Sequence, residues 1–445
     1  MLQLKQRKRL ANIRKNHVSN AIDFKDYIDK YNNEVHFMNN KDEPFYRWYP
    51  FVEGFSGNFV KSIIEELDYE PILCLDPFAG SGTTPLACQE SDIKCISFEI
   101  NPFLVDLMKV KLYRGYDLRY VEDTIDKFEL NLDKLDLAPD YPEIDPETLF
   151  EKDDLKKWIF HKEVAWGILD VLNEIENLPE GSNYHKALFK IALASNLVGV
   201  SNVFRNGKCL SYKPNWKINR PSRSNVHDAF INFCRNVILD DLRKMSPANH
   251  SVDNYSLCRK GDARELIKDL DNDSIDLVVT SPPYLNSRDY TDIYRLELWI
   301  LGYLKSYADE RELRKSTLRS HVQIPWTRIE APEIADLKTV LDSIEQSRDK
   351  LWNKSIPEMI RGYFADMNII FGILHGKLKS GSRIYIDVGN SSYQKIPIET
   401  DCIISQIAEK NSFRLDEIRI ARYLKSSGQQ NSPKLRESII VLSKT

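Results

Sequence analysis

The sequence lacks any apolar stretch near the roughly 20 residues that a membrane-spanning helix requires, and its N-terminus lacks the apolar core of a signal peptide. Its seven cysteines (74, 88, 95, 209, 234, 258 and 402) contain no CxxC pair, and its eight histidines show no HxxxH spacing. These absences argue against a membrane protein, a metal site and a disulfide framework. They predict a cytoplasmic protein with Cys74 and Cys95 in its core.

A strong excess of either charge is also missing, because 62 basic residues nearly balance 66 acidic ones. The 445 residues and the 42 % hydrophobic content are typical of a globular protein with two or three folding units. The basic start of the chain, MLQLKQRKRLANIRKNH, is predicted to be a solvated tail. Contact with a polyanion is the alternative.

Strands and helices alternate in two parts of the chain. PILCLD (71–76) is a predicted strand that stops at a glycine turn, and IKCISFEINP (93–102) is a second strand that ends in an acid. The same alternation returns at 256–284 and after 365, which predicts an α/β fold with helices on both faces of a parallel sheet. The predicted organisation is a basic N-terminal arm (1–45), a discontinuous α/β domain (46–114, 256–304 and 365–445), a larger helical insert (115–255) and a second helical insert (305–364).

The stretch LDPFAGSGTT places Gly80 and Gly82 where the first strand turns into a helix. Glycine lets a ligand approach the backbone, and the start of a helix favours an anionic group. The stretch is not a GxxxxGK[ST] phosphate loop, and it lacks the third glycine of GxGxxG. S-adenosylmethionine remains as the predicted cofactor, with Asp76 facing its amino group or sulfonium. A purely structural turn is the alternative.

Two further acids close predicted strands. Glu99 ends the second strand and suits the two ribose hydroxyls of a nucleoside cofactor. Asp262 ends the third strand and can accept from an adenine amino group. It can equally cap the helix that begins at ARELIKDL, and the two roles are compatible.

A rigid corner follows the fourth predicted strand in VVTSPPYLNSRDY (278–290). Pro282 and Pro283 hold the backbone near one φ value, so the Pro282 carbonyl keeps its direction. This carbonyl and the Ser281 hydroxyl can accept the two N–H groups of a nucleobase amino group and favour its attack on a methyl donor. Tyr284 provides a ring for stacking on a base that has left the duplex. Such a reaction requires neither a metal nor a covalent enzyme intermediate.

FAGSG (78–82) and SPPY (281–284) together match a known pattern. The chain resembles the S-adenosylmethionine-dependent DNA methyltransferases that methylate exocyclic amino groups. The resemblance covers the α/β half of the chain. It implies a methyltransferase with a Rossmann-like sheet, and it implies double-stranded DNA as the substrate. It also implies a restriction–modification or defence setting, with a companion endonuclease as a possible partner. The cofactor residues that it implies, together with neighbours in the same turn, are Asp76, Phe78, Gly80, Gly82, Thr83, Glu99 and Asp262.

With serine before the prolines, this motif resembles that of the subgroup that methylates cytosine N4. Methylation of adenine N6 is the alternative. An RNA or protein-glutamine methyltransferase is a rival, although such enzymes usually carry aspartate or asparagine before the prolines. A non-catalytic DNA-binding subunit that retains the fold is a rival from another class. Intact Gly80, Gly82, Ser281 and Tyr284 argue against the loss of activity.

The larger insert contains SNVFRNGKCLSYKPNWKINRPSR (201–223), in which basic and aromatic residues alternate. Basic side chains contact phosphates and aromatic ones stack on bases, so this stretch is the leading DNA-contact candidate. The alternative is a solvated connection with inward-packed aromatics. Residues 311–328 and 423–436 are further candidates. The predicted DNA-contact side chains are Arg205, Lys208, Lys213, Trp216 and, beside the pocket, Arg288.

Overall fold

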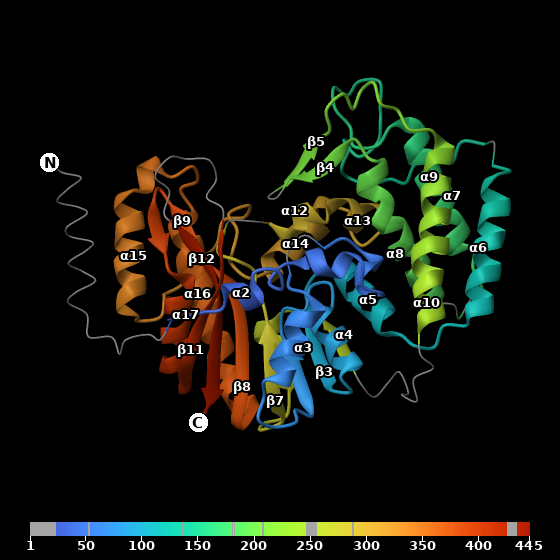
Figure 1. The fold of residues 1–445 in the computed structure, drawn as a ribbon. Helices are drawn as coiled ribbons and strands as arrows, with labels where there is room; N and C mark the ends of the chain where they lie inside the picture. The colour runs from blue at the N-terminus through green and yellow to red at the C-terminus, as the bar shows by residue number, and fades with distance from the viewer. Residues whose placement is uncertain are drawn as a thin grey trace.

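A computed structural model describes residues 24–51, 54–135, 137–179, 181, 183–206, 209–245, 256–286, 289–424 and 434–445. Its centre is an eight-stranded sheet with the order β1-β11-β12-β8-β7-β2-β3-β6 (Figure 1). The strands are β1 (Phe24–Asp26), β2 (Leu73–Asp76), β3 (Lys94–Glu99), β6 (Ser256–Lys260), β7 (Ile275–Thr280), β8 (Leu378–Gly389), β11 (Phe413–Leu424) and β12 (Leu435–Lys444).

Strands β6, β3, β2, β7 and β8 pair in parallel, whereas β12 runs antiparallel to both β8 and β11. The sheet is therefore mainly parallel, and its parallel part is built from the strands that alternate with helices in the sequence. The predicted α/β, Rossmann-like fold is confirmed.

Both faces of the sheet are buried, which explains the nearly continuous apolar runs in its strands. Leu277 and Val279 of β7 belong to one apolar cluster, with residues of α3 (Gly57–Glu65) and α4 (Thr83–Glu90). Val278 faces the opposite cluster, which contains residues of α16 (Ile356–Lys377) and α17 (Thr400–Lys410). The period-two alternation of a strand thus separates the two layers of helices.

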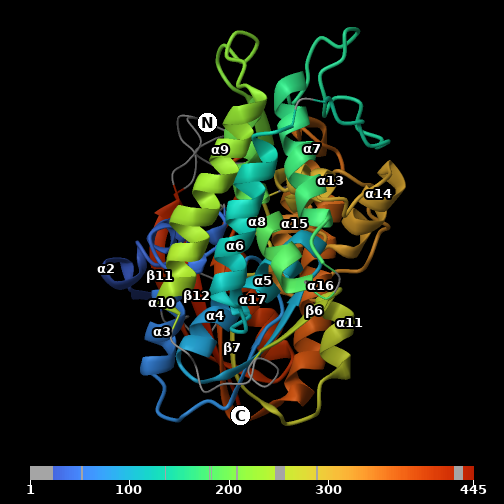
Figure 2. The same ribbon diagram turned by 90° about the vertical axis from the view of Figure 1, so that its right-hand side faces the viewer.

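The larger insert forms a group of helices beside the sheet, seen at the right of Figure 1 and side by side in Figure 2. It also contains a two-stranded ribbon, β4 (Val203–Asn206) and β5 (Cys209–Tyr212), which the sequence analysis had not predicted. The third apolar cluster joins these helices to α5, the helix after β3. The helices are α5 (Pro102–Leu112), α6 (Leu118–Leu132), α7 (Lys162–Glu176), α8 (Asn183–Val200), α9 (Arg223–Phe233), η3 (Cys234–Leu239) and α10 (Asp240–Lys244).

The second insert and its neighbours lie over the end of the sheet where the parallel strands finish. Helices α12 and α13 follow the SPPY corner, α14 and α15 belong to the insert, and a short hairpin follows β8. Their bounds are α12 (Tyr290–Ile293), α13 (Arg295–Ile300), α14 (Tyr307–Ser316), α15 (Ala335–Gln346), η6 (Arg348–Lys350), β9 (Ser391–Tyr393) and β10 (Ile396–Ile398). Between β6 and β7 lie α11 (Ala263–Leu266) and η5 (Ile267–Asp269).

The structure differs from the expected N-terminal arm at residues 24–45. Strand β1 pairs in parallel with the edge strand β11, and Tyr31, Val35 and Phe37 are buried. These residues therefore join the fold, because an edge strand offers unpaired backbone groups and the aromatic side chains gain a buried position. This segment contains α2 (Ile28–Tyr31) and η1 (Phe37–Lys41) and is followed by η2 (Tyr46–Trp48). The basic residues 1–23 lie outside the described residues.

Candidate active site

The strand order reverses between β2 and β7. The chain moves from β2 outward to β3 and β6, returns to β7, and then continues outward to β8. In open α/β sheets, ligands bind at the carboxyl ends of the strands on either side of such a reversal. At this point the Thr280 hydroxyl of β7 donates to Asp76 Oδ1 of β2 at 2.7 Å, which ties the two strand ends together.

A cleft of about 1310 Å³ opens at this reversal. It contains residues of the glycine turn and of the SPPY corner, and it exceeds the roughly 300–1,000 Å³ of ordinary ligand pockets. Two ligands can therefore lie side by side in it. The predicted site residues that line it are Asp76, Phe78, Gly80, Thr83, Glu99, Asp262, Ser281, Pro282, Pro283 and Tyr284.

The two glycines of the turn have different surroundings. Gly80 has φ +53°, and a Cβ atom there would lie 2.9 Å from the ring of Phe51, another residue that lines the cleft. Gly82 has φ +84°, and a Cβ atom there would lie 2.9 Å from Met108 Cγ of α5. Both backbones therefore require glycine. Gly80 keeps the cleft open, whereas Gly82, which does not line the cleft, permits helix packing.

Asp76 is almost fully buried, with 2 % of its surface exposed. Its Oδ1 atom accepts from the Phe78 backbone N–H at 3.0 Å as well as from Thr280. Burial raises the pKa of this carboxyl to about 7, although the hydrogen bonds from Thr280, Thr84 and Phe78 oppose the rise. Asp76 thus changes charge near neutral pH at the edge of the cleft.

Glu99 and Asp262 hold the backbone around the cleft. Glu99 accepts from the backbone N–H groups of Gly80 at 2.9 Å and Asn101 at 2.8 Å, and burial raises its pKa. Asp262 accepts from the backbone N–H of Arg264 at 2.9 Å, so it caps α11. Its other oxygen pairs with the Arg264 guanidinium at 2.6 Å. The helix-cap interpretation of Asp262 is confirmed, and its side chain still lines the cleft.

The ring of Tyr284 is held by residues that the sequence analysis missed. Its hydroxyl lies 2.8 Å from Glu437 Oε1 and 3.1 Å from Asp387 Oδ2. Burial, with the nearby charge of Glu437, raises the pKa of Asp387 well above its usual range. A Cβ atom on Gly389 would lie 2.9 Å from the ring. The only sequence signal was an acid within each of the apolar stretches IYIDVG and ESIIVL.

Two of the predicted DNA-contact residues have internal partners. The Arg205 guanidinium pairs with Glu297 Oε1 at 2.6 Å and also contacts the Tyr49 hydroxyl. Lys213 Nζ donates to the carbonyls of Val198, Gly199 and Ser201 at 2.6–2.9 Å, where α8 ends. In this structure both side chains already have internal partners, and a role for either in DNA contact stays a prediction.

Trp216 packs within an aromatic cluster, with ring centroids 5.0 Å from those of Trp158 and Tyr212. The inward-packed alternative therefore describes its position better than an exposed DNA contact. Lys208 and Arg288 lie outside the described residues. The sequence analysis did not single out Trp352, Gln394 and Lys395, which line the cleft near the second insert.

Three cysteines that do not line the cleft meet in the core. The sulfur atoms of Cys74, Cys88 and Cys95 all lie within 4.8 Å of one another, and all three side chains are buried. Cys74 and Cys95 occupy paired positions on β2 and β3, and their predicted place in the core is confirmed. The absence of a metal site stays a prediction. Among the described residues, no helix is long and apolar enough to cross a bilayer.

Comparisons with known proteins give similarities to DNA methyltransferases. A family model described as a DNA methylase, for the N6 and N4 class, matches residues 11–110. The type II methyltransferase M.AvaI of a Nostoc species is 29 % identical over 432 residues, which cover 89 % of this chain and 84 % of that protein. M.BsoBI of Geobacillus stearothermophilus, also a type II methyltransferase, is 26 % identical over 465 residues, covering 92 % and 87 %.

Similarity to solved structures is weak. A DNA modification methylase of Thermus thermophilus in complex with S-adenosyl-L-methionine is 16 % identical, with a TM-score of 0.20, over 41 % of this chain and 51 % of that one. The rRNA methyltransferase aviRa of Streptomyces viridochromogenes is 11 % identical, with a TM-score of 0.27, over 89 % and 86 %. The family match and the curated relatives point in the same direction as the FAGSG and SPPY motifs: the chain is similar to DNA methyltransferases of the N6 and N4 class.

Proposed function

We propose that this chain is a site-specific methyltransferase of a type II restriction–modification system, which methylates cytosine N4 of a base flipped out of duplex DNA. The observation that carries the proposal is the shared cleft, in which the glycine turn and the SPPY corner open together. The two curated relatives are type II methyltransferases, which supports the setting and a companion endonuclease. Adenine N6 is the alternative target.

The cofactor half of the cleft suits an elongated nucleoside. Asp76, Glu99 and Asp262 lie at or just beyond the ends of β2, β3 and β6, which are neighbours in the sheet. Neighbouring strands are about 4.8 Å apart, so the three carboxylates follow one another along the edge of the sheet. We assign the methionine end to Asp76 and Gly80, the ribose to Glu99 and the adenine to Asp262. When bound, S-adenosylmethionine supplies a methyl group on a positively charged sulfur.

The base half of the cleft suits an exocyclic amino group. The Ser281 hydroxyl and the Pro282 carbonyl accept its two N–H groups, which orients the nitrogen lone pair and stabilises the positive charge that develops on nitrogen. The Tyr284 ring stacks on the base. Because the hydroxyl of Tyr284 is held by Glu437 and Asp387, the ring is oriented before the base arrives. Serine in SPPY supports cytosine N4.

Sequencing of modified DNA from cells that express the chain tests this function directly. N4-methylcytosine at one short recognition sequence is the expected result, with no modification in cells that express Ser281→Ala. N6-methyladenine at one sequence would overturn the assignment of the base and retain the enzyme. The absence of any modified base would favour the non-catalytic DNA-binding subunit.

Gly80→Ala is expected to weaken the binding of S-adenosylhomocysteine at least tenfold. The new methyl group would lie 2.9 Å from the Phe51 ring and force it into the cleft, and φ +53° disfavours alanine by about 1 kcal/mol. Gly381→Ala is the matched control, because Gly381 has φ +81° with nothing within 4 Å of the added Cβ. Calorimetric titration of both variants measures the difference. Equal affinities would contradict the place of Gly80 in the cofactor site.

Trp352 is the best-placed residue for a second contact with DNA. Trp352 is 66 % exposed and lines the cleft, as does Lys395 of the β9–β10 turn. That turn is held against the second insert, because Gln394 Nε2 donates to the Lys350 carbonyl. An exposed aromatic ring in the same cleft as a cation combines stacking on a base with attraction to phosphate.

Trp352→Ala is expected to weaken duplex DNA binding about 5- to 100-fold, as the loss of one stacked base implies. The affinity for S-adenosylhomocysteine should stay within twofold. Ile72→Ala is the control, because Ile72 is 64 % exposed at the opposite end of β2. Fluorescence anisotropy with a labelled duplex measures both variants. An unchanged DNA affinity for the Trp352 variant would rule out this contact.

A further inference from the structure

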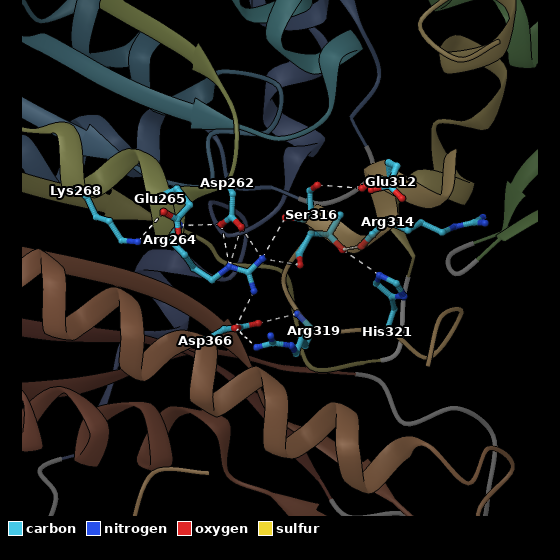
Figure 3. A network of polar contacts seen from close by, with 11 residues as sticks. Asp262, Arg264, Glu265, Lys268, Glu312, Arg314, Ser316, Arg319, His321 and Asp366 are labelled. Carbon is cyan, nitrogen blue, oxygen red and sulfur yellow. Dashed lines mark hydrogen bonds and ion pairs between the residues drawn. The ribbon is translucent and has the colours of Figure 1, made fainter. Parts of the chain in front are cut away.

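Arg264 joins three segments that are far apart in the sequence (Figure 3). Its guanidinium pairs with Asp262 Oδ2 at 2.6 Å and with Asp366 Oδ1 of α16 at 2.8 Å. It also donates to the carbonyls of Ser316 and Thr317 at 3.3 Å, where α14 ends. An arginine has five N–H donors in a rigid plane, so it cannot change one of these contacts without disturbing the others.

The segment beyond α14 has a second attachment to the same carboxylate. Asp366 is fully buried, and it accepts from the Arg319 guanidinium at 2.5 Å and from the Arg319 backbone N–H at 3.1 Å. The Arg319 side chain crosses α16 at Gly362, where an added Cβ would lie 2.5 Å from Arg319 Cδ. A small residue at position 362 thus admits the second arginine. Both arginines hold this segment to α16.

Residues 316–323, here called the wall segment, form one side of the cleft. Within the segment, the Thr317 hydroxyl lies 3.0 Å from His321 Nε2, and both residues line the cleft. Just before it, Arg314 pairs with Asp289 Oδ2 at 2.6 Å, and Asp289 caps α12. The start of the wall segment therefore lies near Asp262, and the last turn of α14 just before it is attached to α12, the helix that follows the SPPY corner.

We propose that Arg264 is a positioning residue that couples cofactor binding at Asp262 to the placement of the wall segment along the cleft. The inference rests on the proposed function, because it requires an adenine at Asp262. When the adenine amino group donates to Asp262, it limits the motion of this carboxylate. Because the Arg264 guanidinium is rigid, it then limits the motion of the Ser316 and Thr317 carbonyls as well. By linkage, DNA that contacts the wall segment raises the affinity for the cofactor by the same factor.

Hydrogen–deuterium exchange of the full chain, with and without S-adenosylhomocysteine, tests this coupling. In the wild type, the ligand is expected to slow exchange across residues 316–323 at least tenfold. In Arg264→Lys, which keeps the charge but loses the planar fork, the slowing should fall below twofold at saturating ligand. Because each value compares bound with free protein, a uniform loss of stability does not change it.

Two further variants separate the coupling from general damage. Gly362→Ala displaces Arg319 and adds no atom at Asp262 or Arg264, so ligand affinity should stay within twofold while protection of the wall segment is lost. Lys268→Gln removes a nearby cation whose partner is Glu265 at 2.6 Å, and it should retain the wild-type protection. Figure 3 shows this pair on the side of Arg264 away from the wall segment.

The outcomes distinguish this inference from the proposed function. Wild-type protein that fails to bind S-adenosylhomocysteine in calorimetry would overturn the proposed function. Protein that binds the ligand without protection of the wall segment would overturn the coupling and leave the function in place. Full protection in Arg264→Lys would overturn the role of Arg264.

Discussion

Replacement of Ser281 by alanine is expected to lower the rate of methyl transfer about 10²- to 10³-fold, while the affinity for S-adenosylhomocysteine stays within twofold. The lone pair of an exocyclic amino group is delocalised into the base, so attack requires the nitrogen to become more tetrahedral. Loss of the Ser281 hydroxyl leaves the Pro282 carbonyl as one acceptor for two N–H groups. One N–H group of the base then has no acceptor, so the amino nitrogen is less well oriented and its developing positive charge is less stabilised.

Single-turnover transfer of a radiolabelled methyl group to unmodified duplex DNA measures this effect separately from product release. Ser274→Ala is the control, because Ser274 lies at the other end of β7 and its hydroxyl donates to the Asp271 carbonyl at 2.8 Å. A wild-type single-turnover rate in the Ser281 variant would exclude the role assigned to this hydroxyl.

Replacement of Asp76 by asparagine is expected to stabilise the folded protein by about 4 kcal/mol at pH 8, and to weaken cofactor binding about tenfold. Burial raises the pKa of Asp76 from 3.8 to about 7. This difference corresponds to about 4 kcal/mol. Because the folded pKa is the higher one, the neutral side chain favours folding below pH 4. That contribution disappears as the pH rises from about 4 to about 7, and asparagine, being neutral, retains it.

The difference in stability between the asparagine variant and the wild type should therefore grow by about 3 kcal/mol between pH 5 and pH 8. Urea unfolding at the two pH values measures it, with the exposed Asp271→Asn as the control. A constant difference across this range would mean that Asp76 does not titrate there. In the proposed site, the charge that destabilises the fold favours cofactor binding, because the methionine end of the cofactor carries a positive group.

The same ionisation predicts how cofactor binding depends on pH. A nearby cation favours the charged form of a carboxylate, so bound ligand lowers the pKa of Asp76 from its value of about 7. Wild-type affinity for S-adenosylhomocysteine is therefore expected to fall as the pH drops from 8 to 6, whereas the asparagine variant should lack this part of the dependence. Calorimetric titration across this range checks the prediction.

The glycine turn and the proline corner were predictable because the chemistry resides in adjacent residues. Glycine tolerates positive φ and proline restricts φ wherever they occur, so FAGSG and SPPY carry their backbone geometry within the sequence. The parallel sheet was predictable for a related reason, since both of its faces are covered and its strands are nearly continuous apolar runs.

The partners of charged and aromatic side chains were not predictable in this way. Arg205 was predicted to contact DNA, but its partner Glu297 lies 92 positions further along the chain. Tyr284 lines the cleft, and Glu437, which lies 2.8 Å from its hydroxyl, is 153 positions away in the sequence. Basic and aromatic residues that alternate in a sequence suit both nucleic acid and a packed loop, and only folding determines which acids lie opposite them.

The kind of chemistry predicted for this protein follows from its motifs alone, because backbone restriction, hydroxyl groups and carboxylates are properties of individual residues and their neighbours. Where these groups meet in space depends on the fold. The reversal of strand order between β2 and β7 brings Asp76 next to Thr280, 204 positions away, and makes one cleft from two distant motifs. The wall segment lies beside the cleft because it is held to α16. Asp366 of α16 is a buried charge that requires charged partners, and the fold provides them from distant parts of the sequence.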